Sequence, residues 1–162
     1  MKDKNFPVDI TEENIQSRIR GLLLMAISNK FNSLLVTTGN KSEMAVGYAT
    51  LYGDMCGGFA LIKDLYKTQV YELAKWRNEN FLDSFFVKKA EIIPKNVLKK
   101  EPTAELKFNQ KDTDSLPAYN VLDKILELLI EKNLDINSIV KNGYNKKLVR
   151  KIWMMIKKSE YK

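Results

Sequence analysis

The sequence predicts an α/β domain with a small parallel sheet, flanking helices and a helical C-terminal part. Twice along the chain, at 33–48 and at 59–78, a short apolar run leads through a polar turn into a segment with helical spacing. This order is typical of parallel α/β sheets. The 162 residues, of which 44% are hydrophobic, suffice for one core, so we expect a single domain.

A long helix is expected first, beginning at residue 12. Thr11 is a suitable N-cap, Glu12 and Glu13 favour the positive end of a helix dipole, and Ile10 is placed to pack against Ile15. The apolar stripe that we expect to face the core consists of Ile15, Ile19, Leu22, Leu23 and Ala26, and a neighbouring stripe consists of Asn14, Arg18, Gly21 and Met25.

Two short buried strands are expected next, over 33–38 and over 59–62. The first leads into a helix that begins at Asn40 or Ser42. The second follows a glycine-rich loop and leads into a helix over 65–78. Both units therefore run from strand to polar turn to helix.

The rest of the chain is predicted to be mostly helical. Pro94 suits the first position of a short helix, and the polar segment 101–119 predicts a long ordered loop. The helices expected after this loop lie over 121–132, over 134–140 with Gly143 beyond the end, and after an N-cap at Asn145. The inner face of the last helix is expected to consist of Val149, Ile152, Trp153 and Ile156.

Composition excludes several kinds of chemistry. The chain has no histidine and one cysteine, so Ser-His-Asp and Cys-His catalysis, an intrachain disulfide and thiolate metal clusters are excluded. Carboxylates, lysines, hydroxyls and an oxygen-loving ion such as Mg²⁺ remain. No apolar run is long enough for a membrane span, and MKDKNFPVDI lacks the apolar core of a signal peptide, so a cytoplasmic protein is expected. The net charge of +7 suits an anionic partner.

The turn TTGNKSE (37–43) follows the first expected strand and is the first candidate site. In open α/β sheets ligands gather at the carboxyl ends of strands, so this turn and the turn near Lys67 should share one rim. The turn is not a Walker A loop, because Leu35 stands where that motif has its first glycine. Thr38 and Glu43 are nevertheless placed to contact a ligand. From spacing alone, a capped strand-to-helix turn without a ligand is the favoured interpretation.

Four longer segments resemble a known family. They read ENIQSRIRGLLLMAISNK (13–30), LLVTTGNKSEMAVGYATLYGDMCGGFALIKDLYKTQVYELAKWRN (34–78), KKEPTAEL (99–106) and QKDTDSLPAYNVLD (110–123). Together they resemble the synthetase domain of the glutamine-dependent NAD⁺ synthetases over nearly the whole chain. The resemblance implies a partial adenine-nucleotide α-hydrolase-like, Rossmann-like fold, with 1–162 as a single partial synthetase domain.

The resemblance also implies an activity. In this family ATP adenylates the nicotinate carboxylate of deamido-NAD⁺ with release of pyrophosphate, and ammonia then displaces AMP to give NAD⁺. ATP and Mg²⁺ are the implied cofactors, deamido-NAD⁺ is the implied substrate, and a homodimer is the usual assembly.

Individual positions match the family's motifs. The positions that the resemblance assigns to ATP are Thr38, Lys67 and Thr103, and those it assigns to deamido-NAD⁺ are Asn14, Arg18, Glu43 and Lys162, with Glu43 also assigned to the metal. Each position also has a purely structural interpretation. Glu43 and Lys67 then belong to the solvated surface, Thr103 forms a turn, and Arg18 is an exposed partner of Glu13 or Asn14.

The sequence also departs from the family. The 162 residues contain no Ser-Gly-Gly-x-Asp-Ser loop, which in the family wraps the ATP phosphates, and no glutaminase domain. We therefore expect a C-terminal fragment of a synthetase that is inactive alone, which steady NAD⁺ production from deamido-NAD⁺, ATP and ammonia would refute. A sheet without its first strands leaves an open edge, so we expect self-association or pairing with the missing N-terminal half.

The alternative is a non-catalytic remnant or binding module that uses its basic surface for an anionic partner. Residues 145–162 carry seven Lys or Arg against Glu160 alone. Nucleic acid is disfavoured as that partner, because aromatic residues are not interleaved with the basic ones as in a stacking platform. Nucleic-acid binding would weaken steeply with salt and would not depend on Thr38 or Glu43.

Overall fold

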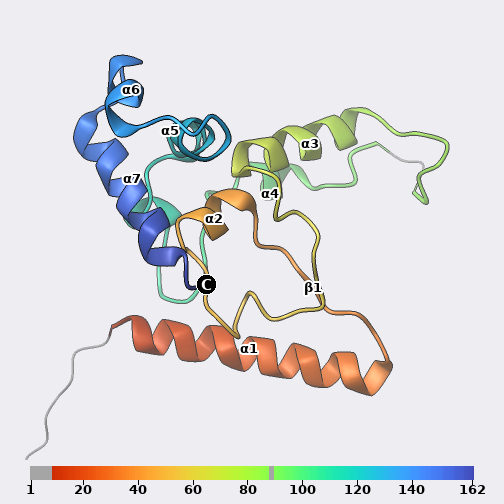
Figure 1. Cartoon of the computed structure of the whole chain (residues 1–162). Helices are drawn as coiled ribbons and strands as arrows, with labels where there is room; N and C mark the ends of the chain where they lie inside the picture. The colour runs from red at the N-terminus through yellow and green to blue at the C-terminus, as the bar shows by residue number, and fades with distance from the viewer. Residues whose placement is uncertain (1–8, 88–89) are drawn as a thin grey trace, which may run out of the picture.

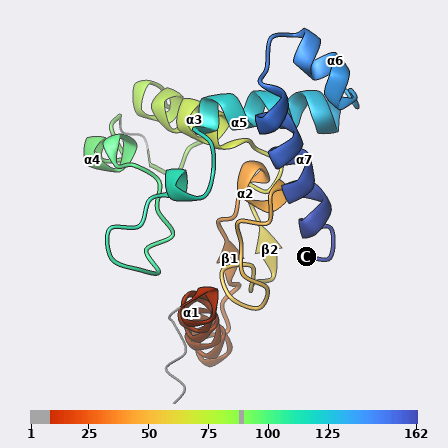
Figure 2. The same ribbon diagram turned by 90° about the vertical axis from the view of Figure 1, so that its left-hand side faces the viewer.

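The computed structural model describes residues 9–87 and 90–162. The segment 1–8, which belongs to the stretch that argued against a signal peptide, lies outside them. Figure 1 shows helix α1 (Ile10–Phe31) along one side of the molecule and the C-terminal helices on the opposite side. The turned view in Figure 2 places the sheet between them. Within the described ranges, no helix is long and apolar enough to cross a membrane.

The sheet consists of β1 (Val36–Thr37) and β2 (Phe59–Ala60), which pair in parallel with Val36 opposite Phe59. The prediction of a parallel α/β arrangement is confirmed. The predicted strand lengths and their burial were wrong, since each strand has two residues and Val36 and Phe59 are 40% and 54% exposed. In the part of the chain that the structure describes, these strands pair only with each other and form a two-stranded sheet.

Both strands lead into helices as predicted. Helix α2 (Lys41–Ala45) begins after an Asn40 N-cap, whose side chain accepts from the Glu43 amide at 3.1 Å, and is shorter than expected. Helix α3 (Lys67–Glu79) follows β2 and coincides closely with the predicted range. Helix α4 (Lys95–Lys99) is the predicted short helix, with Pro94 one position earlier, at the N-cap.

The segment before the C-terminal helices is the predicted loop, interrupted by a 3-10 turn η1 (Asp112–Asp114). Helix α5 (Tyr119–Leu126) continues into a π-helical turn η2 (Glu127–Glu131). Helix α6 (Ile136–Lys141) and helix α7 (Lys146–Ser159) complete the chain. The predicted Asn145 N-cap is confirmed, because its side chain accepts from the amides of Lys147 and Leu148.

The core lies among α2, α5, α6 and α7. Its buried apolar residues are Val46, Tyr66, Leu116, Leu122, Ile125, Leu126, Ile139, Val149 and Ile152. Val149 and Ile152 were predicted on the inner face of the last helix, and Ile156 is partly buried there. The same prediction was wrong for Trp153, which is 37% exposed with the Lys157 ammonium 5.7 Å from its ring centre.

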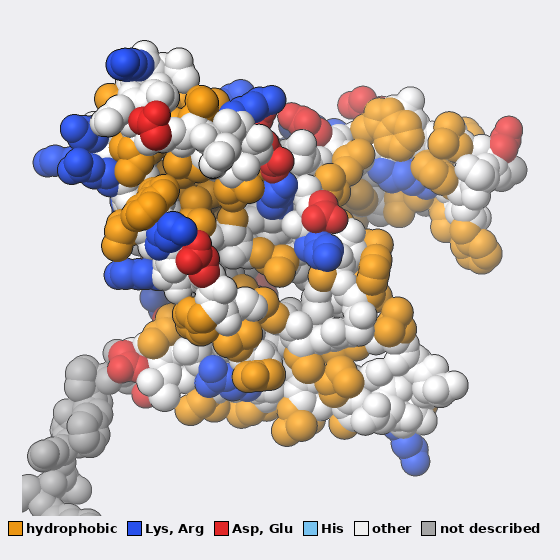
Figure 3. Space-filling model, in the orientation of Figure 1, with side chains coloured by type: hydrophobic (Ala, Val, Ile, Leu, Met, Phe, Trp, Pro, Cys, Tyr) orange, Lys and Arg blue, Asp and Glu red, His pale blue; other side chains and the backbone are white. Residues whose placement is uncertain are grey.

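Helix α1 contradicts two predictions. It begins at Ile10 after an Asp9 N-cap, because the Asp9 carboxylate accepts from the Thr11 amide and Glu12 closes the capping box, so Thr11 is not the cap. The expected inner stripe also faces outward, since Leu22 and Leu23 are 70% and 58% exposed. Figure 3 shows this apolar surface along α1.

The face of α1 that packs inward is made of small residues. Ser17 and Gly21 are its buried residues, and both meet the loop that follows Thr50. The Ser17 hydroxyl accepts from the Asp54 amide at 3.0 Å and donates to the Asp54 carboxylate at 3.2 Å. A methyl group at Gly21 would lie 2.9 Å from the Gly53 carbonyl oxygen. Close approach and hydrogen bonding, rather than apolar spacing, thus decide which side of α1 faces the protein.

Gly47 offers a test of how the end of α7 packs on the region after α2. Its φ is +71°, and an added Cβ would lie 2.7 Å from the Ser159 Cβ. Gly143 also has a positive φ, +93°, but has nothing within 4 Å of an added Cβ. We expect Gly47→Ala to lower the free energy of unfolding, measured in urea, by about 1–3 kcal/mol more than Gly143→Ala does. Both variants strain the backbone, but only Gly47→Ala also creates a steric clash. Equal losses would contradict the packing of Ser159 on Gly47.

Candidate functional site

A cavity of about 680 Å³ lies between α1, the end of β1, α2 and the loops after them. Six of the seven predicted site residues line it, namely Asn14, Thr38, Glu43, Lys67, Thr103 and Lys162. These residues come from segments far apart in the sequence. The structure therefore brings most of the predicted residues to one place.

Glu43 and Lys67 form the charged centre of this site. The capping box of α2 holds the Glu43 carboxylate near the Asn40 amide, at 3.2 Å, and its other oxygen accepts from the Lys67 ammonium at 2.8 Å. Their side chains are 17% and 20% exposed. Lys67 is the first residue of α3, where a helix dipole disfavours a cation, so the Glu43 carboxylate compensates locally.

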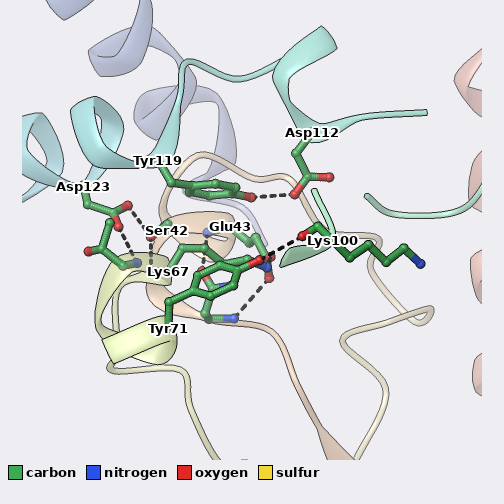
Figure 4. Close-up of polar contacts among 10 residues, drawn as sticks. Ser42, Glu43, Lys67, Tyr71, Lys100, Asp112, Tyr119 and Asp123 are labelled. Carbon is green, nitrogen blue, oxygen red and sulfur yellow. Dashed lines mark hydrogen bonds and ion pairs between the residues drawn. The ribbon is translucent and has the colours of Figure 1, made fainter. Parts of the chain in front are cut away.

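Tyr119 covers this ion pair, as Figure 4 shows. The Lys67 ammonium lies 5.4 Å from the centre of the Tyr119 ring, and the phenol donates to Asp112 at 2.7 Å. Burial raises the pKa of Tyr119 well above its ordinary value, and the Asp112 hydrogen bond raises it further. The phenol therefore stays protonated into the alkaline range and keeps its hydrogen bond to Asp112.

Two buried polar atoms at the cavity have no hydrogen-bond partner among residues 9–87 and 90–162. They are the phenol oxygen of Tyr48 and one carboxylate oxygen, Oδ1, of Asp112, which is 3% exposed. Both residues line the cavity. Burial and the neighbouring Asp112 carboxylate raise the pKa of Tyr48, so these two groups lie beside each other in the cavity wall without a well-formed hydrogen bond between the two atoms.

The two threonines lie at the cavity from different segments. Thr38 directly follows β1, which is the carboxyl end that the sequence analysis identified. Thr103 lies in the long loop, where its hydroxyl accepts from the Glu105 amide at 3.1 Å. The Arg20 guanidinium donates to the Glu105 carbonyl at 3.0 Å and so ties this loop to α1.

Asn14 and Arg18 both face the loop at 50–51, as their shared stripe on the helix predicted. The Asn14 carbonyl accepts from the Thr50 hydroxyl at 3.0 Å, and the Arg18 guanidinium donates to the Leu51 carbonyl at 3.2 Å. Asn14 lines the cavity and Arg18 does not, whereas Arg20 does. The structure thus brings Arg18 to the neighbouring loop rather than to the cavity.

Lys162 reaches the cavity from the chain end. Its ammonium donates to the backbone carbonyls of Gly47, at 2.6 Å, and Ala49. Burial lowers the pKa of Lys162 from its ordinary value. These contacts hold the segment after α2 in the wall of the cavity.

Comparison with known proteins adds an independent observation. The sequence model of the NAD synthase family matches residues 1–162. The chain belongs to the NAD synthase family. A glutamine-dependent NAD⁺ synthetase of Thermotoga maritima is 56% identical over 154 residues, which are 95% of this chain and 26% of that protein. The chain thus spans about a quarter of the length of this relative.

Two solved structures of the family extend the comparison. The glutamine-dependent NAD⁺ synthetase from Acinetobacter baumannii, in complex with ADP, has a TM-score of 0.51 and 47% identity over 98% of this chain and 26% of its own. The NMN synthetase from Francisella tularensis has a TM-score of 0.73 and 25% identity over 98% of this chain and 56% of its own. The predicted family and its adenine-nucleotide α-hydrolase-like fold class are confirmed.

Two buried carboxylates at or near the cavity, Asp112 and Asp123, were not singled out from the sequence. Asp112 sits in the polar loop, and only its position against Tyr119 marks it as buried. Asp123 is 4% exposed within α5, between the buried Leu122 and Ile125. The helical spacing was the available signal for Asp123, because it lies three residues before Leu126 and so on the apolar face of α5, where a buried carboxylate requires partners.

Proposed function

We propose that the cavity is part of an ATP-dependent amide-forming site, with deamido-NAD⁺ as the substrate and ATP and Mg²⁺ as cofactors. The Glu43–Lys67 ion pair carries this proposal, because it sets an acidic and a basic group side by side at the carboxyl end of β1. Membership of the NAD synthase family supports this choice of ligands. On this proposal residues 1–162 form one partial synthetase domain of a cytoplasmic protein.

The residues divide between the two ligands. Thr38, Lys67 and Thr103 would contact ATP, since hydroxyls and an ammonium suit phosphate oxygens. Asn14, Arg18, Glu43 and Lys162 are proposed for deamido-NAD⁺. For Arg18 and Lys162 this requires release from their backbone carbonyl partners.

Glu43 is the proposed protein ligand of Mg²⁺. In the described parts of the chain, no group of three or more His, Cys, Asp or Glu side chains is placed to hold a metal ion. Mg²⁺ commonly uses one or two carboxylates and takes its other ligands from water and substrate phosphates, and the single Glu43 carboxylate fits that arrangement. Mg²⁺ would neutralise the charge on pyrophosphate as it leaves.

The proposal assigns binding, rather than turnover, to these residues alone. The sequence contains no Ser-Gly-Gly-x-Asp-Ser phosphate loop, so we propose that the complete site includes a phosphate-binding segment from a second chain or a missing N-terminal half. Copies of this chain all lack that loop, so a homo-oligomer, which we also expect from the open sheet edge, would still need the missing N-terminal half to provide it.

Calorimetric titration of deamido-NAD⁺ in the presence of a non-hydrolysable ATP analogue tests the proposal. With Mg²⁺, we expect Glu43→Ala to weaken binding by about tenfold or more, the usual effect of losing a charged contact. With EDTA in place of Mg²⁺, wild type should bind no more tightly than Glu43→Ala, because without the metal the Glu43 carboxylate only repels phosphate. Glu131→Ala is the matched control, since this carboxylate pairs with Lys41 outside the cavity.

Two results would contradict the proposal. One is an absence of binding by the wild-type chain at millimolar ligand. The other is binding that Glu43→Ala leaves unchanged with Mg²⁺ and that falls steeply with salt, which would favour the alternative of a basic surface for an anionic partner.

A further inference from the structure

Helix α3 begins with half of a capping box, in which the Gln69 side chain accepts from the Tyr66 amide at 2.8 Å, and its N-cap residue offers no acceptor to the first helical amides. Its N-cap residue, Tyr66, makes no side-chain hydrogen bond to the helix. The first amides of a helix have no partner within the helix and are costly to leave unpaired when buried. Since Lys67 is the first residue of α3, a group that accepts hydrogen bonds from these amides also fixes the position of the Lys67 Cα, from which its side chain extends.

Two distant side chains replace the missing cap. The Lys67 amide donates to the Ser42 hydroxyl at 2.8 Å, and the Thr68 amide donates to the Asp123 carboxylate at 2.9 Å. The Ser42 hydroxyl in turn donates to the other oxygen of Asp123 at 2.5 Å. Figure 4 shows this network beside the Lys67 side chain.

The network is buried, and both oxygens of the Asp123 carboxylate take part in it. Ser42 is 0% and Asp123 4% exposed, and each oxygen of the Asp123 carboxylate accepts one hydrogen bond. A carboxylate at the start of a helix is also favoured by the helix dipole. Asp123 therefore lies where its charge and both of its oxygens stabilise one geometry of the α3 start.

Two residues on one face of α5 fix both the backbone and the ammonium group of Lys67. Tyr119 and Asp123 are four residues apart on this helix and so lie on the same side. Asp123 fixes the backbone through Thr68 and Ser42, while the face of the Tyr119 ring lies 5.4 Å from the Lys67 ammonium. The ammonium is thereby held 2.8 Å from Glu43.

We propose that Asp123 is a positioning residue, which caps α3 from α5 and so holds the Lys67 ammonium against Glu43 at the cavity. The proposal rests on the proposed function only for the use of Lys67 in binding phosphate. The effect of Asp123 on the placement of Lys67 stands on the geometry alone.

The test compares Asp123→Ala with Asp123→Asn in the full 162-residue chain. The first readout is the NMR resonance of the Lys67 side-chain methylene next to the ammonium, which the nearby Tyr119 ring shifts and which Lys67→Met identifies. We expect Asp123→Ala to move this resonance toward its random-coil position, and the exchange of the Lys67 and Thr68 amides to quicken by about tenfold or more. Asp123→Asn keeps one acceptor oxygen but loses the charge and the second acceptor, so both readouts should lie between wild type and Asp123→Ala.

The second readout is titration with inorganic pyrophosphate and Mg²⁺. Removal of a negative charge would by itself strengthen anion binding, so a loss of affinity in Asp123→Ala has the opposite sign to a simple charge effect. We expect affinity to fall to about that of Lys67→Met, and the double variant to be no weaker than Lys67→Met, because both changes act through one group.

Control variants separate positioning from general stability. Asp135→Ala removes a carboxylate that caps α6 and should leave both readouts unchanged. If Asp123→Ala does not fold, Ser42→Ala removes the other half of the cap and should move the Lys67 resonance in the same direction. The proposal is overturned if the Lys67 resonance stays at its wild-type position in both Asp123→Ala and Ser42→Ala. It is also overturned if the affinity losses of Asp123→Ala and Lys67→Met add up in the double variant. If wild type does not bind pyrophosphate, the proposed function fails and the resonance still decides the role of Asp123.

Discussion

Leu126→Ala is expected to lower the free energy of unfolding by about 2–5 kcal/mol. Leu126 is 0% exposed at the end of α5, in the core that α5 shares with α6 and α7. Truncation there removes buried apolar surface and leaves a cavity that close-packed neighbours fill only partly. Since small domains are stable by only about 5–15 kcal/mol, this loss is a large fraction of the total, and the urea midpoint should fall by a similar fraction. Urea denaturation followed by tryptophan fluorescence measures the change.

Leu23→Ala is the matched control for this prediction. It makes the same chemical change in α1, where Leu23 is 58% exposed, and should alter stability by no more than about 0.5 kcal/mol. If both variants lost equal stability, the apolar face of α1 would be covered in solution, and the separation of core from surface given above would be wrong.

Lys67→Met is the second change with a large expected effect. It leaves the Glu43 carboxylate, 17% exposed, without its cation, and we expect a loss of about 1–3 kcal/mol in the free energy of unfolding. It should also weaken the binding of Mg²⁺-pyrophosphate, because the ammonium no longer neutralises the phosphate. Denaturation and calorimetric titration on the same preparation measure both effects.

A second substitution separates the two roles of the pair. In Lys67→Met/Glu43→Gln the unpaired charge is gone, so stability should recover while pyrophosphate binding does not. Lys41→Met is the control, because Lys41 pairs with Glu131 at a more exposed site and should cost less than about 1 kcal/mol. Recovery of binding together with stability would contradict a direct role of Lys67 in holding phosphate.

The order of elements was predictable because it depends on local signals. The Asn145 side chain accepts from two amides of α7, and Gly143 adopts a positive φ after α6, so both helix boundaries follow from single residues. The two strand-to-helix turns were likewise placed on one rim, because parallel strands end at a common edge, while the family resemblance assigned Lys67 to the site. Apart from that assignment, these inferences needed only the neighbouring sequence and a general rule of α/β sheets.

The orientation of α1 was not predictable from periodicity. Its apolar stripe is real, yet Ser17 and Gly21 are the residues that the loop after Thr50 covers. Periodicity identifies an apolar face but not the surface that packs on it. In the same way, apolar runs predicted the strands, whereas the extent of β1 and β2 depends on which residues find partners.

The sequence by itself determined the α/β class, the order of the elements, the Asn145 cap, the chemistry available without histidine, and six residues that line the cavity. Only the tertiary structure decided which face of α1 packs inward, that Arg18 contacts the Leu51 carbonyl, and that Asp123 reaches α3. The physical reason is the separation along the chain over which each interaction acts. Caps, turns and periodicity act within a few residues, whereas burial and the pairing of the Asp123 carboxylate with an amide 55 residues away depend on how distant segments meet.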